Sequence, residues 1–347
     1  MELGMKIRQL RNRAGLTQEE MADRLGITAQ SVSKWENRAA MPDITLLPSI
    51  AEIFGVTIDD LFDLTREQRM RRIASRVEWD AEIPADEFRD YEDFLTEQMA
   101  DGEARTEATS LLAELYHSRM DADAKRVSRY ARESMEAEPG VKRCQWLLGR
   151  AEGAAVWDWN AGQHSRVIDF FRGLTREHPD TVSPYYYLID NLLADHRVDE
   201  AEAALGIMRT LPGMKPMMAA VYEAHIALAR FDEEAADRIM EAGLEEFTGD
   251  DGFLFETAQY YAKKADYERA VRYYEEAYEA DPERPRLIDA LEAVALIREI
   301  QGKYREAAAV WDRIVASLRD EWGCAEEAVL ADALRERTRL TERARQE

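Results

Sequence analysis

A periodic pattern of small and bulky residues in the second half of the sequence constrains the fold more than any other feature. Small or β-branched residues recur at spacings of 34, 34, 35 and 37 residues, each followed four positions later by a large apolar residue. The small set is Val167, Ala201, Ala235, Ala270 and Ala307, and the large set is Phe171, Leu205, Ile239, Tyr274 and Trp311. Residues four apart share a helix face, where the small residue lets a second helix approach closely. The pattern predicts about five stacked pairs of antiparallel helices between residues 140 and 318, after at least one divergent pair.

The segment 251–284 contains the most complete copy of this unit. Its pattern positions, which resemble those of a tetratricopeptide repeat, are Leu254, Ala258, Tyr261, Ala270, Tyr274, Ala277 and Pro282. Beyond Pro84 no strand pattern of any strength appears, and prolines interrupt the helical stretches. We therefore predict an all-α chain in which residues 84–324 form a tetratricopeptide-like α-solenoid and residues 325–347 form a terminal helix. That helix either caps the last repeat or joins another subunit.

Stacked helix pairs curve so that the first helix of each pair lines a concave wall, which commonly binds peptides or partner helices. In the predicted register the inward-facing residues are Trp159, Tyr186, Asp190, Leu193, Phe255, Gln259 and Leu296. This apolar and aromatic set suits a short hydrophobic peptide. The alternative is that several of these side chains pack between neighbouring repeats, because an error of one residue turns a helix position by about 100°.

The N-terminal part is organised differently, as five short helices separated by clear stop signals. The second of these begins at a capping box formed by Thr17 and Glu20 and ends at Gly26. A third begins almost at once, with Thr28 as its N-cap. Two helices joined by so short a turn cross at a steep angle, and the second projects outward to fit a major groove. This spacing predicts a five-helix DNA-binding domain over residues 1–64.

The third helix of this domain carries residue types that can read base edges, on the face opposite its apolar residues. Gln30 can pair with adenine through its amide, and Lys34 suits guanine acceptors or a phosphate. The residues predicted to meet double-stranded DNA are Gln18, Thr28, Ala29, Gln30, Ser31, Ser33, Lys34, Asn37 and Arg38. The alternative is a small helical domain without a DNA role, but the outer face of this helix has no acidic residue before Glu36.

Three stretches of this N-terminal part share their spacing of caps, glycines and apolar residues with a known family: TQEEMADRLGITAQSVSKWENR, MPDITLL and AEIFGVTIDDLF. They resemble the XRE, or lambda-repressor-like, helix-turn-helix transcriptional regulators over residues 4–62. The resemblance implies that Arg11 pairs with Glu36, and that Asn37 and Arg38 meet backbone phosphates. At Arg38 the sequence departs from the family, in which glycine is common at this position. Repeats behind such a module resemble the peptide-responsive regulators of Gram-positive bacteria, in which the ligand alters dimer geometry.

The net charge of −24 is distributed unevenly between the two parts. Residues 1–79 contain 12 Lys and Arg against 12 Asp and Glu, whereas residues 80–347 contain 34 against 58. The acidic part should repel non-specific DNA from every surface except the cationic face of the neutral domain. Between them, residues 65–83 contain five arginines and predict a basic linker helix, which either extends the DNA contact or is simply solvated.

The sequence contains no motif for catalysis, a cofactor or a metal. The histidines fall in different predicted repeats, and Cys144 and Cys324 are far apart without metal-ligand spacing, so we expect both to be ordinary thiols. No apolar run approaches the roughly 20 residues that span a bilayer, so a cytoplasmic protein without a membrane partner is expected.

Two hypotheses follow for the function. In the first, the chain is a homodimeric transcriptional regulator whose repeats sense a peptide or protein signal. Dimerisation is inferred because one short reading helix rarely supplies enough specificity by itself. In the second, the repeats form an interaction scaffold for a partner protein, and DNA binding only localises the assembly.

Overall fold

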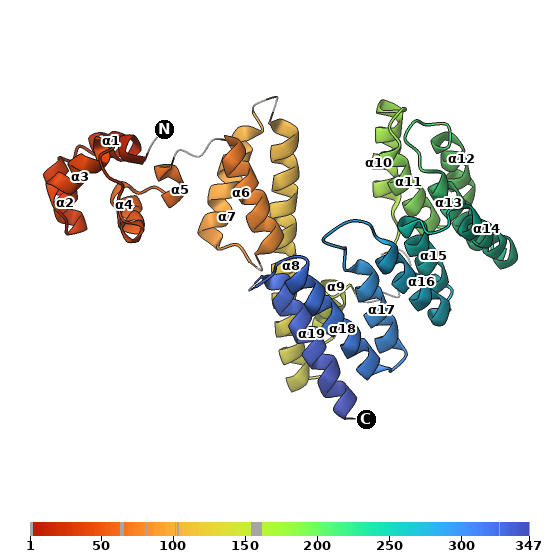
Figure 1. Ribbon diagram of the computed structural model, residues 1–347. Helices are drawn as coiled ribbons and strands as arrows, with labels where there is room; N and C mark the ends of the chain where they lie inside the picture. The colour runs from red at the N-terminus through yellow and green to blue at the C-terminus, as the bar shows by residue number, and fades with distance from the viewer. Residues whose placement is uncertain are drawn as a thin grey trace. The chain divides into compact units, whose positions relative to one another are not determined.

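The computed structural model describes residues 3–62, 66–80, 82–100, 102, 104–153, 162–325 and 327–346. The described residues form α-helices and one 3₁₀ helix and contain no strand (Figure 1), which confirms the all-α prediction. The chain divides into two compact units, residues 1–123 and 124–347.

The first unit begins with the five short helices expected from the sequence. They are α1 (Leu3–Arg13), α2 (Gln18–Leu25), α3 (Ala29–Glu36), α4 (Leu47–Phe54) and α5 (Ile58–Leu61), with a 3₁₀ turn, Ile44–Leu46, before α4. Fully buried Ile7, Met21, Val32 and Ile50 form the centre of their core, and Trp35 is almost as deeply buried. Each of these residues comes from the apolar stripe of its helix, so burial of that stripe fixes how the helices pack.

A second helical cluster of this unit contains α6 (Arg66–Trp79), α7 (Ala85–Gln98) and the first part of α8 (Arg105–Ala137). Met70 and Ile73 of α6 are buried against α7 and α8. Two arginines of α6 also pair with acids of α7, Arg69 with Asp90 and Arg76 with Glu87, each at 2.8 Å. α6 is therefore a packed helix rather than the solvated linker that its charge suggested, because Met70 and Ile73 form a buried stripe with Ala74 and Val77 packed beside them.

The second unit contains the helix pairs of the predicted solenoid. After α9 (Lys142–Ala151) and α10 (Ser165–Glu177), the pairs are α11 (Ser183–Ala194) with α12 (Val198–Met208), α13 (Pro216–Ala229) with α14 (Glu233–Glu246), α15 (Asp251–Lys263) with α16 (Tyr267–Ala280), and α17 (Asp289–Ile300) with α18 (Tyr304–Asp320). The terminal helix α19 (Ala328–Arg345) packs on α18, where Leu340 is buried against Ala307 and Ala308. This contact is the one that a capping helix would make.

The small-residue pattern holds in three helices, α12, α16 and α18, and is displaced by one residue in two others, α10 and α14. Ala201, Ala270 and Ala307 are fully buried between helices, as predicted. Val167 is 42% exposed and Ile168 beside it is fully buried. Likewise Ala236, not Ala235, is the fully buried residue of α14, and Met240 takes the place expected for Ile239. These two predictions were wrong because either of two adjacent apolar residues satisfies the sequence pattern, whereas only one can face the partner helix.

The turns inside the four pairs share one backbone conformation. Each turn has three residues, and the middle one has a positive φ: His196 (55°), Phe231 (62°), Ala265 (57°) or Gly302 (73°). The amide of Ala265 donates to the carbonyl of Ala262, and that of Asp266 donates to the carbonyl of Tyr261; the other three turns repeat this pattern. These two hydrogen bonds define the Schellman motif, which satisfies carbonyl groups left over at the helix end. The same turn thus reverses the chain in every pair.

We expect Ala265→Gly to stabilise the repeat unit by about 0.5–1 kcal/mol. A residue with a side chain loses about 1–2 kcal/mol in the left-handed region, and glycine removes this strain. Part of the gain is lost because glycine makes the unfolded chain more flexible. Ala265 is exposed, so its methyl group contributes little packing. Urea unfolding followed by circular dichroism measures the change. Gly302→Ala makes the reverse substitution at the equivalent turn and should lower the midpoint; a lower midpoint for Ala265→Gly would contradict this account.

Candidate nucleic-acid interface and repeat groove

Helices α2 and α3 are held in a helix-turn-helix by hydrogen bonds at their ends. The Thr17 hydroxyl accepts from the amide of Glu20 at 3.1 Å, and the Glu20 carboxylate accepts from the amide of Thr17 at 2.7 Å, which completes the capping box. Thr28 caps α3 by accepting from the amide of Ser31. Gly26 takes a left-handed conformation between the two helices. The turn predicted from the sequence is therefore present.

A buried ion pair joins α1 to the end of α3 and confirms the pairing implied by the family resemblance. Arg11 donates to both oxygens of Glu36, at 2.6 and 3.0 Å, and also to the carbonyl of Leu16 at 2.6 Å. Gln18, at the start of α2, donates to the same carboxylate at 2.8 Å. One carboxylate thus links three helices. Burial alone would raise the pKa of Glu36, but the hydrogen bonds from Arg11 and Gln18 hold this pKa below its ordinary value.

Gly4 was not singled out in the sequence, yet it determines how closely α1 approaches α3. A Cβ atom at this position would lie 1.9 Å from the carbonyl oxygen of Trp35, which is part of the backbone and cannot move aside easily. Gly4 itself is buried. No pattern signal identifies such a glycine, because its role depends on a contact with a residue far away in the sequence.

The residues predicted to meet DNA surround the outward face of α3. Thr28, Gln30, Lys34, Asn37 and Arg38 are exposed, whereas Gln18, Ala29, Ser31 and Ser33 are half-buried. The side-chain amide of Gln18 donates to Glu36, so this bond orients the side chain that is predicted to contact a phosphate. An amide nitrogen carries two hydrogens, so one remains for a second acceptor.

Arg38, where the family commonly has glycine, adopts a left-handed backbone conformation. Its φ is 62°, and its amide donates to the carbonyl of Trp35 while that of Ala39 donates to the carbonyl of Lys34. This is again a Schellman motif, here with an arginine in the left-handed position. An arginine therefore occupies a left-handed position that usually favours glycine, and its side chain lies beside the end of α3.

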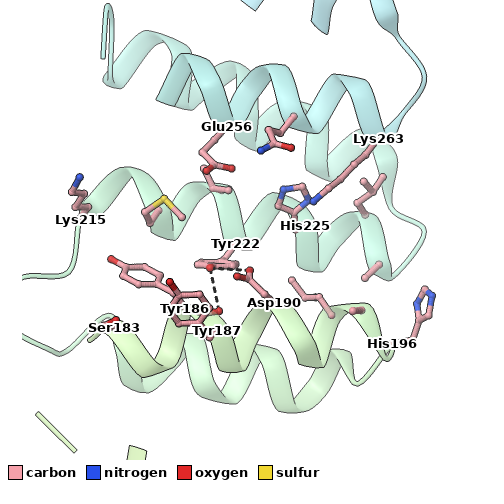
Figure 2. A pocket seen from close by; sticks show the side chains of 17 residues that line it. Ser183, Tyr186, Tyr187, Asp190, His196, Lys215, Tyr222, His225, Glu256 and Lys263 are labelled. Carbon is pink, nitrogen blue, oxygen red and sulfur yellow. Dashed lines mark hydrogen bonds between the residues drawn. The ribbon is translucent and has the colours of Figure 1, made fainter. Parts of the chain in front are cut away.

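The repeat unit contains a groove with a cavity volume of about 940 Å³. It is formed by the first helices of three successive pairs (Figure 2), and its lining includes Ser183, Tyr186, Tyr187, Asp190, Leu193, His196, Lys215, Met218, Val221, Tyr222, His225, Leu228, Glu256, Gln259 and Lys263. Asp190, His225 and Gln259 each lie six residues before the left-handed residue of their turn. The common turn thus gives all three helices the same register and points equivalent positions into the groove.

Four of the residues predicted for this groove lie in its lining: Tyr186, Asp190, Leu193 and Gln259. Phe255 does not; its ring packs edge to face against Tyr274, with centroids 5.3 Å apart, and the next residue, Glu256, lines the groove instead. Leu296 of α17 is 58% exposed but contributes nothing to this cavity. Trp159 lies outside the described residues. The sequence does not identify Tyr222, Glu256 and Lys263 as groove residues, because their place follows from the distance to turn residues that are not glycines, Phe231 and Ala265.

Several ionisable side chains lie at the centre of the groove (Figure 2). The Tyr222 hydroxyl donates to Asp190 at 3.0 Å. Asp190 is exposed as a residue, yet the groove wall desolvates its carboxylate and raises its pKa, against the opposing effects of this hydrogen bond and of Lys263. Burial likewise raises the pKa of Glu256, and the negative charge of Asp190 adds to the effect. Burial and the charge of Lys263 lower the pKa of His225 to about 3, so its imidazole is neutral near pH 7.

The described part of the chain holds no group of three or more His, Cys, Asp or Glu side chains arranged to bind a metal ion. Within the same residues, no helix is long and apolar enough to cross a membrane. Cys324 is buried, and burial raises the pKa of its thiol.

Comparison with known proteins matches the N-terminal domain. A helix-turn-helix family model covers residues 7–61. The transcriptional activator BcrR of Enterococcus faecalis is 41% identical over 61 residues, which are 18% of this chain and 30% of BcrR. An uncharacterized HTH-type transcriptional regulator of Archaeoglobus fulgidus is 33% identical over 63 residues, which are 18% of this chain and 90% of that protein. The chain therefore spans less than a third of BcrR but nearly the whole of the archaeal protein.

Among solved structures, Bacillus thuringiensis PlcR in complex with the peptide PapR7 and DNA aligns with 98% of this chain and 94% of its own. The sequence identity is 13% and the TM-score is 0.20. A similarity this low carries no conclusion about function.

We expect Glu36→Gln to destabilise the helix-turn-helix by about 3 kcal/mol at neutral pH, because it leaves the buried Arg11 without its charge partner. The lowered pKa of Glu36 means that this carboxylate stabilises the fold above its unfolded pKa of about 4.3, and that the contribution is lost as pH falls through the folded value. The difference between wild type and variant should therefore shrink below about pH 4.

Hydrogen exchange of the amides in α1–α3, measured at several pH values, reports the stability of this domain alone. Groups that titrate in the repeats do not enter this measurement. Glu19→Gln removes the same charge from the exposed face of α2 and should leave exchange unchanged. A difference between Glu36→Gln and wild type that stays constant with pH would rule out the ion pair as its source.

Proposed function

Because the chain belongs to the XRE-type helix-turn-helix family of transcriptional regulators, we propose that it is a sequence-specific DNA-binding regulator. In this proposal α3 enters the major groove and reads base edges, and the groove of the repeat unit receives a peptide or protein signal. The single observation that carries the DNA-binding part is the exposed, acid-free outer face of α3 on a correctly capped helix-turn-helix.

Two side chains on α3 have the chemistry for direct readout. Gln30 lies in the first turn of the helix, where its amide can donate to and accept from adenine. Lys34 lies one turn later on the same exposed face and can donate to guanine acceptors or to a phosphate. Ala29 and Ser33, both half-buried, complete the surface that would approach the bases.

Phosphate contacts would fix the orientation of α3 in the groove. Asn37 and Arg38 follow the end of α3 and are both exposed. Gln18 lies at the N-terminus of α2, where the helix dipole favours an anion. Contacts of this kind position a protein on DNA without carrying sequence information, so specificity rests on Gln30 and Lys34.

We further propose that the regulator binds DNA as a homodimer. α3 has eight residues, so one copy reads only a few base pairs. Two copies related by a two-fold axis would read half-sites about 34 Å apart on one face of the duplex. The operator should then be palindromic.

The groove is the proposed signal site because of its size and composition. Its volume of about 940 Å³ lies near the upper end of the range for small-ligand pockets, which is about 300–1,000 Å³. It also extends over three adjacent repeats, as an extended peptide requires.

We expect the double variant Gln30→Ala with Lys34→Ala to weaken specific DNA binding by about 1–3 kcal/mol for each lost base contact. Genome-wide footprinting of the purified full chain on fragmented genomic DNA, at about 150 mM salt, measures this and gives the operator. A palindromic site that disappears with the variant would establish both the reading helix and the dimer.

The matched control is Lys142→Ala with Gln346→Ala, which removes the same two side-chain types from exposed positions of the repeat unit. It should leave the footprint unchanged. Equal binding by wild type and the Gln30 and Lys34 variant would remove α3 from its assigned role, and binding nowhere above background would favour the scaffold hypothesis.

We expect Arg38→Gly to change the stability of the domain and its affinity for DNA in opposite directions. Because Arg38 has a positive φ, glycine should stabilise the end of α3 by about 0.5–1 kcal/mol. Loss of a phosphate contact should nevertheless weaken binding to all sequences and reduce the slope of log K against log salt by about 1. Filter binding at several salt concentrations measures the slope; an unchanged slope would show that Arg38 does not contact DNA.

A further inference from the structure

The centre of the repeat groove contains two carboxylates that come from different helix pairs. Asp190 points into the groove from α11 and Glu256 from α15, with Tyr222 of α13 between these helices (Figure 2). Asp190 accepts one hydrogen bond, from Tyr222. Glu256 is half-buried and forms no hydrogen bond or ion pair within the described part of the chain. A half-buried carboxylate in this situation needs a donor from outside the protein.

The cations of the groove do not neutralise these carboxylates. Lys215 and Lys263 are both exposed, and neither forms an ion pair with a described residue. Lys263 lowers the pKa of both Asp190 and Glu256, yet burial outweighs it and both values stay raised. His225 is neutral near pH 7 and adds no positive charge. The groove therefore favours either a proton or a ligand cation at its centre.

The surrounding wall has the composition of a peptide site. His225 and Gln259 line the groove and make no hydrogen bond with a described residue, so their polar atoms are available to a peptide backbone. Apolar side chains border this centre: Leu193, Met218, Val221 and Leu228. The rings of Tyr186 and Tyr222 stack with centroids 6.1 Å apart, and the hydroxyl of Tyr222 meets Asp190 (Figure 2). Apolar walls around a few polar groups are typical of ligand sites.

We propose that the groove selects a short peptide segment by one basic side chain, which binds between Asp190 and Glu256 while its apolar neighbours pack on the surrounding wall. This inference rests on the proposed function, in which the groove is the signal site. Charge complementarity selects the occupant: an ammonium or guanidinium group can donate to both carboxylates through charge-assisted hydrogen bonds. The tyrosine rings add cation–π attraction.

Defined peptide pools test the proposal on the full chain. The probes are acetylated and amidated heptapeptides whose fourth residue is fixed as arginine, glutamine or glutamate and whose other positions are drawn from leucine, phenylalanine, serine and glycine. Blocked ends remove terminal charges, so the central side chain is the only variable charge. Immobilised protein should retain the arginine pool at least about tenfold more than the glutamine pool, as quantified by mass spectrometry.

Two variants assign this preference to the carboxylates. Asp190→Asn with Glu256→Gln keeps the shape of the groove and should reduce the ratio of arginine to glutamine retention to about one. Glu256→Lys should shift retention towards the glutamate pool. The matched control, Asp180→Asn with Glu245→Gln, removes two exposed acids outside the groove and should preserve the ratio.

Three results would overturn the proposal: equal retention of the arginine and glutamine pools, no retention of any pool, or a preference that persists in Asp190→Asn with Glu256→Gln. DNA binding by the same preparation keeps this failure separate from failure of the proposed function. Intact DNA binding without an arginine preference refutes only the groove inference, whereas an arginine preference without DNA binding refutes the DNA-binding regulator.

Discussion

When a helix ends with one residue in the left-handed region, two hydrogen bonds close its last turn and the chain leaves the helix in a new direction. Both units of this protein depend on that turn. In the first unit it occurs at Gly15, Gly26, Arg38 and Gly55, and in the second it occurs once in each of four helix pairs. Because the turn is the same in every pair, residues at equal distances from it face the same way. The groove lined by Asp190, His225 and Gln259 is a direct consequence.

The orientation of α3, the helix proposed to read DNA, depends on two contacts besides the turn at Gly26. The carboxylate of Glu36 receives hydrogen bonds from α1 and α2, so it fixes the end of α3 against both helices. Gly4 lets the backbone of α1 touch the carbonyl of Trp35. Neither group lies on the outer face of α3. The contacts therefore hold Gln30 and Lys34 in a fixed direction without occupying the surface that would meet DNA, which lowers the entropy lost on binding.

The sequence predicts those features whose signal is local. Glycine marks the turn at Gly26, and the Thr17 capping box marks the start of α2. His196, Phe231 and Ala265 make the same turn without glycine, so the equivalence of the repeat turns appears only in the structure. Burial is predicted where one apolar residue stands alone, as at Ala201, and is ambiguous where two adjoin, as at Val167 and Ile168. The groove position expected for Phe255 is taken by Glu256 because the ring of Phe255 packs against Tyr274, a contact that no local sequence pattern specifies.

The negative charge of the repeat unit bears on both proposed sites, the DNA-binding face and the groove. Many acids on the repeat unit are already paired with arginines, such as Glu275 with Arg313 and Glu299 with Arg339. Such exposed pairs stabilise little. The acids in excess, 58 against 34 Lys and Arg in residues 80–347, leave a diffuse negative field that repels DNA and attracts cations from a distance. Glu256 differs because it is half-buried, has no ion pair with a described residue and faces a cavity. The diffuse field can therefore raise the rate at which a basic peptide arrives, whereas Asp190 and Glu256 decide whether it stays bound.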